Sequence, residues 1–491
     1  MSPATKHVLV VGGGTSGAVL AARLTESPSV RVTLLEAGPD DTVYDSVVLD
    51  PSRAAEAWAG AAPIAPTPMA HGDGSILMFQ GRVLGGTSAV NGMATLRGLP
   101  PDYDDWAARG LDGWGWDDVV DTFIAAERDV DLGASPLHGD AGPLPVRRWR
   151  REEMSRAQLA FLDGMLDLGE AAADDINDPS QLPGIGRFPV TIDDNDRRVS
   201  TSLAYLTAGV RARENLTIRT GAEVATVAID GDQATGVVLT SGEELDADEV
   251  VVATGAIWTP LLLMRSGIGP ADHLAQRGIT AVADLPVGET MSDHLGPGIP
   301  YRHDGPRGGQ AGPAQVVLVG ASNGTDVDYH AFPIAPAPTT DETTFMMAVF
   351  LMRSSGRGSV RLGDTVGADP VVTAPPLPDD ARAVLRHGFD QLVAWERSSA
   401  AQALGCEPVV PIDLTADDAV DVALERNTMS YGHMVGTCPM GPVLDADCRV
   451  RGIDGLRVVD ASVMPTIPSG NTYLGCVMVA ERVARKMLAD G

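Results

Sequence analysis

A glycine-rich segment near the amino terminus constrains the fold of this chain more than any other feature. Residues 12–17 read Gly-Gly-Gly-Thr-Ser-Gly, which fits the pattern G-x-G-x-x-G. The segment lies between a β-branched apolar run at 7–11 and a helix-forming stretch at 18–26, and a second strand is predicted at 32–35. This strand–turn–helix–strand order predicts the opening of a doubly wound α/β domain.

Each glycine of the motif has a physical role in binding a dinucleotide. Gly12 permits the tight turn, Gly14 lets a pyrophosphate approach the backbone, and Gly17 lets the helix pack closely on the strand. The free backbone amides of the first helical turn, which includes Thr15 and Ser16, point toward the phosphates. We therefore expect these residues to bind the cofactor.

An acidic residue ends the second predicted strand. Glu36, followed by Ala37, lies 19 residues beyond Gly17, where a carboxylate can accept hydrogen bonds from both ribose hydroxyls. An acid at this point disfavours a 2′-phosphorylated nucleotide. FAD and NAD both remain possible on these residues alone.

The middle of the chain changes character. Short alternating runs at 216–219, 224–229 and 236–240 are separated by glycines and predict a small antiparallel meander. The continuous β-branched run at 249–253 predicts a strand buried on both faces.

A second lobe is expected after residue 295. Residues 296–380 are rich in proline and glycine and contain three strand-like islands, which indicates a second sheet with long loops. The tail returns to α/β character. The three islands lie at 315–319, 327–331 and 344–353. Helices are predicted at 382–401 and 416–426 in the second lobe, and the tail contains a predicted strand at 456–459 and a predicted helix at 475–488.

Composition excludes several classes of protein. The net charge of −30 argues against a nucleic-acid binder, and no apolar run approaches the roughly 20 residues of a membrane-spanning helix. The four cysteines form no C-x-x-C pair, so neither a disulfide scaffold nor a metal site is expected. The first apolar run lacks the features of a secretory signal. We expect reduced thiols and a cytoplasmic protein.

Two longer motifs point to one family. They read GRVLGGTSAVNGM at 81–93 and GAIWTPLLLMRSGIG at 255–269. Together with the glycine turn and the segments around His433 and Asn471, they resemble the glucose–methanol–choline family of FAD oxidoreductases over essentially the whole chain. Thr95 departs from the pattern, because an aromatic residue or alanine is common there.

The resemblance implies FAD as the cofactor and assigns further residues to it. Some relatives carry a histidine at the position of Val90 that bonds covalently to the flavin, so valine implies FAD held without a covalent link. The residues assigned to the cofactor are Arg82, Gly86, Asn91, Gly92 and Ala94 along its length, the Val224 backbone at the adenine, and Asp460 and Ala461 near the flavin.

The resemblance also implies a discontinuous architecture. We predict an α/β protein in which a Rossmann-like, doubly wound FAD-binding domain carries an inserted α+β substrate domain of an antiparallel sheet and helices. The FAD-binding domain is expected to comprise 1–145, 193–295 and 428–491, and the substrate domain 146–192 and 296–427.

Two carboxyl-terminal residues are candidates for the chemistry. Oxidation of an alcohol needs a base for the hydroxyl proton, and the ordinary pKa of histidine, about 6.5, suits that exchange near neutrality. His433 lies in the segment YGHMVGTCPMG, and Asn471 precedes a helix that begins at Thr472. Asn471 can orient the alcohol oxygen, and the positive end of the helix would face the flavin. The other histidines, His294 and His330 among them, are interpreted as surface or core residues.

These features predict FAD-dependent oxidation of a primary alcohol to the aldehyde. Residues 296–427 contain few aromatic side chains, whereas choline is usually bound in aromatic cages, so a small neutral aryl or furanic alcohol is favoured. The expected acceptor is oxygen or a quinone or other respiratory carrier. The alternatives are a mycofactocin-associated type of dehydrogenase that passes electrons to a respiratory chain, and an FAD-retaining hydroxynitrile lyase. The oligomeric state stays open.

Overall fold

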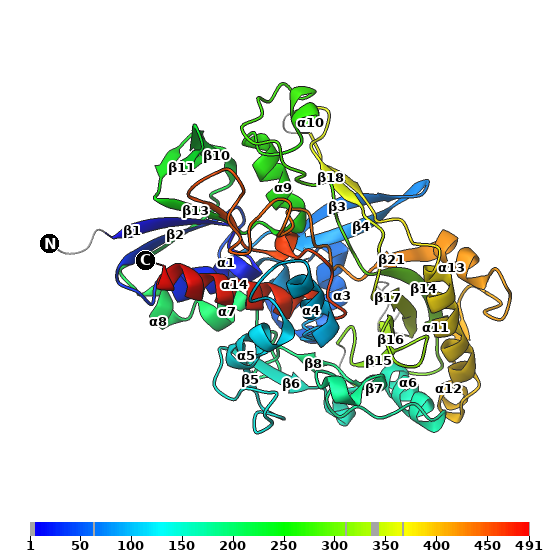
Figure 1. The fold of residues 1–491 in the computed structure, drawn as a ribbon. Coiled ribbons are helices and arrows are strands. Elements are labelled where there is room, and N and C mark those ends of the chain that lie inside the picture. The colour runs from blue at the N-terminus through cyan, green and yellow to red at the C-terminus, as the bar shows by residue number, and fades with distance from the viewer. Residues whose placement is uncertain (1–4, 62–63, 310–311, 335–342, 366–367, 491) are drawn as a thin grey trace.

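The computed structural model describes residues 5–61, 64–309, 312–334, 343–365 and 368–490 (Figure 1). A five-stranded parallel sheet occupies the left of this view, and a larger antiparallel sheet with its helices occupies the right. The chain crosses between the two more than once. The mixed α/β class predicted from the sequence is therefore confirmed.

The parallel sheet is built around the glycine turn. Its strands run in the order β22 (Leu456–Val458), β13 (Glu249–Val252), β1 (Lys6–Val11), β2 (Val30–Glu36) and β9 (Leu216–Thr220). β13 is buried along its whole length, as its continuous β-branched run predicts. Helices α1 (Thr15–Leu24) and α14 (Thr472–Ala489) pack against each other beside the sheet.

One strand lies in a different sheet from the one predicted. β9 pairs in parallel with β2, with Leu216 opposite Val32, so the prediction that residues 216–219 belong to a meander is wrong. The meander consists only of β10 (Val224–Asp230), β11 (Gln233–Leu239) and β12 (Glu244–Asp246). Alternation along a strand identifies the strand but does not identify its partner.

The antiparallel sheet forms most of the second lobe. Its main path runs β20 (Glu407–Pro408), β14 (Leu295–Arg302), β17 (Thr344–Leu351), β16 (Tyr329–Ile334), β15 (Val316–Gly320) and β7 (Gly184–Arg187), and β21 (Thr428–Ser430) also pairs with β14. Helices on one face cover it, namely α6 (Arg156–Asp167), α11 (Ala381–Glu396), α12 (Ser399–Leu404) and α13 (Ala419–Asn427).

The helix predicted at 382–401 is interrupted. α11 ends at Glu396 and α12 begins at Ser399, because the Ser398 hydroxyl accepts a hydrogen bond from the Ala401 amide at 3.2 Å and caps a new helix.

Two smaller sheets complete the fold. The first has the strand order β18 (Ser359–Arg361), β19 (Val371–Thr373), β3 (Ile64–His71) and β4 (Gly74–Gly81). The second has the strand order β5 (Glu127–Asp129), β6 (Leu144–Arg148) and β8 (Pro189–Val190).

Two hydrophobic clusters underlie the two lobes. One collects the parallel sheet and its helices, and the other collects the antiparallel sheet. The side chains of Val360, Leu362, Val372 and Ala374 pack in the first cluster, although this part of the chain falls within the predicted substrate domain. The boundaries of the two domains therefore stay a proposal.

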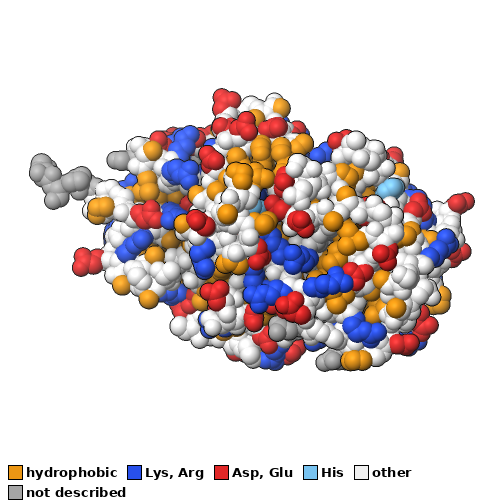
Figure 2. Space-filling model, turned by 90° about the horizontal axis from the view of Figure 1, so that it is seen from below, with side chains coloured by type: hydrophobic (Ala, Val, Ile, Leu, Met, Phe, Trp, Pro, Cys, Tyr) orange, Lys and Arg blue, Asp and Glu red, His pale blue; other side chains and the backbone are white. Residues whose placement is uncertain are grey.

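Charges of both signs are interspersed on the face drawn in Figure 2, where hydrophobic side chains gather near its top and in a band right of centre. The net charge of −30 is thus not concentrated in one acidic patch on this face. In the described part of the chain, no helix is long and apolar enough to cross a bilayer.

Candidate active site

The glycine turn has the close contacts that its motif requires. Gly12 has a φ of +99°, and a Cβ there would lie 2.6 Å from the Ala253 carbonyl oxygen. A Cβ at Gly17 would lie 1.9 Å from the Gly12 carbonyl oxygen. Side chains at either position are sterically excluded, so the turn keeps its backbone open beside the start of α1.

Glu36 lies at the end of β2 against this turn. Its Oε2 accepts a hydrogen bond from the Gly13 amide at 2.8 Å, and its Oε1 accepts one from the Gly38 amide at 2.8 Å. Burial raises the pKa of the Glu36 carboxyl, while the backbone hydrogen bonds oppose that rise. Each oxygen retains lone-pair capacity, so Glu36 can still receive a ribose hydroxyl.

Replacing Glu36 with alanine is expected to weaken FAD retention far more than the chemistry of the enzyme that keeps its flavin. The loss of the ribose acceptor should cost about 1–3 kcal/mol of binding free energy. The measurement is flavin occupancy against FAD concentration, with Glu36→Gln as an intermediate that keeps one acceptor oxygen. Full occupancy of Glu36→Ala at low FAD would contradict this placement of the ribose.

The segment 81–92 packs directly on the glycine turn. The Gly85 amide donates to the Gly13 carbonyl at 2.7 Å, and a Cβ on Gly86 would lie 2.6 Å from the Gly14 Cα. Two side-chain-free backbones therefore face each other next to the amino end of α1. Such a cradle fits the extended pyrophosphate region of FAD.

The other residues assigned to the cofactor differ in what they can offer. Ser16 donates its hydroxyl to the Cys476 carbonyl at 3.2 Å, which leaves its backbone amide for a phosphate. Arg82 is exposed and pairs with Glu223 at 2.8 Å. The Asn91 Oδ1 accepts from the Met93 amide at 3.0 Å, so its side chain shapes the loop.

Further assigned residues occupy turns and strand ends. Asp460 ties β22 to helix α9 (Gly255–Arg265), since its Oδ2 accepts from the Gly255 amide at 2.8 Å and from the Thr259 hydroxyl at 2.6 Å. The remaining positions are Thr15 in the first turn of α1, Ala37 after β2, Gly92 and Ala94 in the loop, Val224 at the start of β10, Ala461 after Asp460, and Thr472 at the start of α14.

The structure brings the two candidate catalytic residues together from separate segments. The Asn471 Nδ2 lies 3.1 Å from the His433 Nε2, and both residues are buried. Asn471 occupies the N-cap position of α14, but its side chain makes no capping hydrogen bond. The purely structural interpretation of Asn471 as a helix cap is therefore not supported.

A third histidine, His294, completes this group, although the sequence indicates only a core or surface residue there. The His294 Nδ1 lies 2.9 Å from the His433 Nδ1, and the His294 Nε2 lies 3.1 Å from the Met352 carbonyl oxygen. That carbonyl can only accept, so His294 carries its proton on Nε2 and accepts at Nδ1 from the His433 Nδ1–H. The His433 Nε2 is then left with a lone pair, which receives the Asn471 amide.

Asp293 fixes the backbone of both histidines. Its Oδ1 accepts from the His294 amide at 2.8 Å and from the His433 amide at 2.9 Å, and its Oδ2 accepts from the Ser430 hydroxyl. Only the sequence position of Asp293 beside His294 could have hinted at this role. The contact itself joins residues 140 positions apart.

Burial strongly affects the ionisation of this group. Burial lowers the pKa of His433 to about 3, with a smaller effect from His330, and it lowers the pKa of His294 well below the ordinary value. Burial raises the pKa of Asp293 to about 6. His433 is consequently a neutral imidazole at neutral pH, and its pKa lies below the range expected from the sequence.

Flavin reduction is therefore expected to be independent of pH between 7 and 9. A depressed histidine pKa means that the neutral base is lost only as the pH falls toward about 3. A fall in rate near pH 6 would report protonation of Asp293. Asp293→Asn keeps both backbone contacts without a charge, and stopped-flow reduction by this variant should show no step near pH 6. A step that persists in Asp293→Asn would contradict the depressed pKa of His433.

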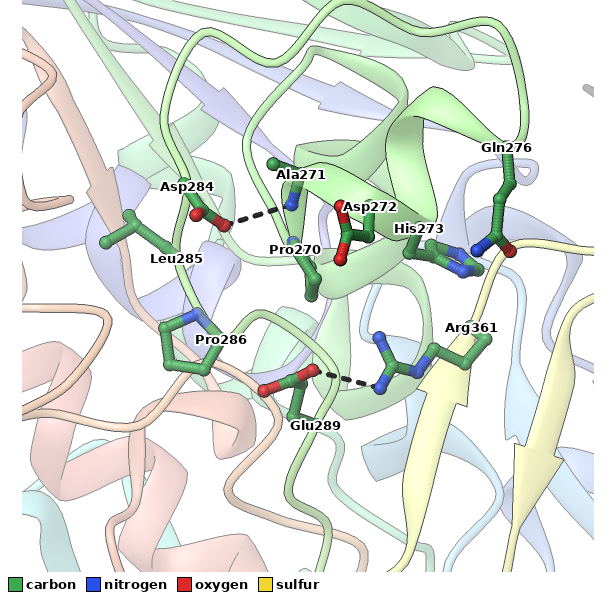
Figure 3. Close-up of a pocket in the computed structure, with 10 residues that line it drawn as sticks. All are labelled: Pro270, Ala271, Asp272, His273, Gln276, Asp284, Leu285, Pro286, Glu289 and Arg361. Atoms are coloured by element: carbon green, nitrogen blue, oxygen red, sulfur yellow. Dashed lines mark hydrogen bonds and ion pairs between the residues drawn. The ribbon is translucent and has the colours of Figure 1, made fainter.

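A surface cavity of about 580 Å³ lies elsewhere in the molecule (Figure 3). It is formed by α10 (Ala271–Ala275), the loop around Asp284 and Glu289, and Arg361 of β18. Three of its charged groups already have partners, since Glu289 contacts Arg361 at 3.1 Å and Asp284 accepts from the Ala271 amide at 3.0 Å. None of the residues assigned to the chemistry lines it.

Glu127, Asp129 and His138 also come together, in a geometry that could hold a metal ion. Arginine side chains occupy this cluster instead: Arg97 pairs with Glu127, and Arg148 pairs with Asp129. The positive charges of these arginines offset the carboxylates, so we assign the cluster to stability.

Comparisons with known proteins identify relatives that match almost the whole chain. Residues 6–296 and 354–480 match the amino-terminal and carboxyl-terminal models described as GMC oxidoreductase. A 5-(hydroxymethyl)furfural oxidase from Methylovorus sp. is 34% identical over 98% of both chains. An oxygen-dependent choline dehydrogenase from Photobacterium profundum is 32% identical over 99% of this chain and 93% of its own. The structure of pyridoxine 4-oxidase from Mesorbium loti superposes with a TM-score of 0.90 at 28% identity, over 99% of both chains.

Proposed function

The chain belongs to the GMC oxidoreductase family, and on that premise we propose that it oxidises a primary alcohol to the aldehyde with His433 as the base. It is an FAD-dependent oxidoreductase that acts on CH–OH groups. When bound, FAD would accept a hydride, which is one hydrogen with two electrons, from the carbinol carbon. The residues of the chain bind and orient the alcohol and take its hydroxyl proton.

One observation carries the assignment of His433. Its Nε2 is the ring nitrogen that carries the lone pair, and the Asn471 amide contacts that nitrogen at 3.1 Å. A substrate hydroxyl that lies beside both atoms and replaces their direct hydrogen bond could donate its proton to Nε2 and accept a hydrogen bond from Nδ2. His294 holds the opposite ring nitrogen at 2.9 Å, which maintains the required tautomer and supports the imidazolium that forms.

A small neutral alcohol with an aryl or furanic ring is the substrate class that we propose. The rings of Tyr431 and Phe350 stack at 4.5 Å between centroids, and Phe332 lies 5.1 Å from Tyr431. The buried histidines are neutral, and the oxygens of Asp293 already accept hydrogen bonds, so little here favours a cation such as choline. The names of two relatives, the furfural and pyridoxine oxidases, are consistent with this choice.

The proposed acceptor is oxygen or a quinone or similar respiratory carrier. A cytoplasmic location is also proposed, because all four cysteines are free and three of them are buried.

Anaerobic mixing of the holoenzyme with a panel of alcohols tests the proposal. Benzyl, furfuryl and aliphatic alcohols, choline and a cyanohydrin would be compared by loss of oxidised-flavin absorbance, followed by reoxidation with oxygen or a quinone. Bleaching by aryl or furanic alcohols is the expected result. Cyanide release without bleaching would overturn the proposal in favour of a lyase.

FAD is expected to be released on heat or acid denaturation. The position at which a covalent link could form holds Val90, whose buried side chain has no nucleophile. Flavin absorbance should appear in the supernatant after the protein has been precipitated. Flavin that remains in the precipitate would contradict non-covalent binding.

A further inference from the structure

Three buried polar atoms near His433 lack a hydrogen-bond partner in the described part of the chain. They are the Asn471 Oδ1, the Tyr431 hydroxyl and the His330 Nδ1. The first two lie within reach of each other, since Asn471 partly offsets the burial that raises the pKa of the Tyr431 hydroxyl. The nitrogen of His330 has no role in that contact, and a buried polar atom without a partner is uncommon enough to need an explanation.

His330 faces the side of the antiparallel sheet that carries the aromatic cluster. It lies in β16 directly opposite Phe350 of β17, and Phe332 follows on the same face two residues later. The neighbouring Tyr329 faces the other way and meets His387 of α11 at 5.7 Å between ring centroids. His330 is 1% exposed, so solvent does not satisfy its ring.

Only one aromatic ring separates His330 from the base. Tyr431 stacks on His433 at 4.2 Å between centroids, and the rings of Tyr431 and His330 form a T-shaped pair at 6.2 Å between centroids. His330 is also close enough to lower the pKa of His433. The polar nitrogen of His330 thus belongs to the aromatic surroundings of the reacting group.

We propose that His330 binds a second polar group of the substrate, so that the alcohol is a flat aromatic ring with a hydroxyl or carbonyl group remote from its carbinol carbon. The inference rests on the proposed function and narrows its substrate class. Burial lowers the pKa of His330 to about 3, and a neutral imidazole can accept from a hydroxyl or donate to a carbonyl. A neutral ring offers no charge to a carboxylate, so carboxylated rings should be poor substrates.

The experiment compares ring substituents in two forms of the holoenzyme. Benzyl alcohols with a hydroxyl or a methyl group at position 3 or 4 would be used with wild type and His330→Phe, and kcat/KM would be measured. The preference is the kcat/KM of the hydroxyl-substituted alcohol divided by that of the methyl-substituted alcohol. At one of the two ring positions this ratio should be about tenfold larger in wild type than in His330→Phe, as expected for one hydrogen bond to a buried group. Because the ratio is compared between variants, the electronic effect of the substituent cancels.

Two variants separate recognition from structural damage. His330→Asn places an amide atom where the Nδ1 lies and should retain most of the preference, whereas His387→Phe alters the opposite face of the sheet and should leave it unchanged. The binding of 4-hydroxybenzaldehyde and 4-methylbenzaldehyde can be measured without turnover, from the change that each causes in the flavin spectrum. The preference for the hydroxyl compound should rank the enzyme variants in the same order as the kcat/KM ratio does. If His330→Phe does not fold, His330→Leu takes its place beside His330→Asn.

The outcomes distinguish the two proposals. Flavin that no alcohol bleaches would overturn the proposed function. Alcohols that bleach the flavin with equal hydroxyl-to-methyl preference in wild type, His330→Phe and His330→Leu would overturn the role of His330 and leave the proposed function standing.

Discussion

Replacing His433 with alanine is expected to slow flavin reduction by about 10²–10⁴-fold, the usual contribution of a positioned acid–base group. FAD binding and the fold should be retained, because the His433 side chain contacts Asn471, His294 and Tyr431 within the site. Its backbone contact with Asp293 is unaffected by the substitution. Anaerobic stopped-flow bleaching by a reactive alcohol measures the effect. Reduction at a rate near that of wild type would remove His433 from the mechanism.

Asn471→Ala provides the comparison within the site. In the proposed mechanism Asn471 orients the alcohol oxygen but takes no proton, so its loss should weaken substrate binding and cost less in rate than the loss of His433. His273→Ala is the matched control, since His273 lines the surface cavity of Figure 3. Equal losses in His433→Ala and Asn471→Ala would favour a shared positioning role over proton transfer.

Replacing His138 with glutamine is expected to destabilise the protein by about 3–5 kcal/mol, the cost of removing one partner from a buried ionic group. The His138 Nδ1 lies 2.8 Å from Glu127 and 3.0 Å from Asp129, and its Nε2 lies 2.8 Å from Asp175. Arg97 and Arg148 supply the other two positive charges against these three carboxylates. The charges balance only while His138 is protonated.

The pH dependence of stability tests the same network. Burial alone would lower the pKa of His138, but its hydrogen bonds to the three carboxylates outweigh burial and raise the pKa to about 10. Because this value lies above the ordinary pKa of about 6.5, the stabilisation is complete below about pH 6.5 and is lost as the pH rises through about 10.

Urea unfolding between pH 6 and 10 is the measurement. The free energy of unfolding of wild type should fall as the pH rises over this range. In His138→Gln the part of this fall that comes from deprotonation of His138 should be absent. His303→Gln, a change at another buried histidine, serves as the control. An unfolding midpoint of His138→Gln equal to that of wild type would show that the network is not a stabilising unit.

The sequence alone determined those features whose signal lies within a few residues. The contacts at Gly12 and Gly17 exclude a side chain, and Glu36 ends β2 where it meets the turn. These are local requirements of one strand–turn–helix unit, so they can be inferred without knowledge of the remaining chain. His433 and Asn471 were also identifiable, because each lies in a motif shared with a family.

The tertiary structure alone decided which distant residues meet. The pairing of β9 with β2, the contact of His294 with His433 across 139 positions and the exposure of the His330 nitrogen to the aromatic cluster have no local signal. A lone histidine in or beside a strand looks the same in sequence whether it faces a helix, solvent or a catalytic base. Strand register and sheet partners set that direction, and both depend on packing between segments far apart in the chain.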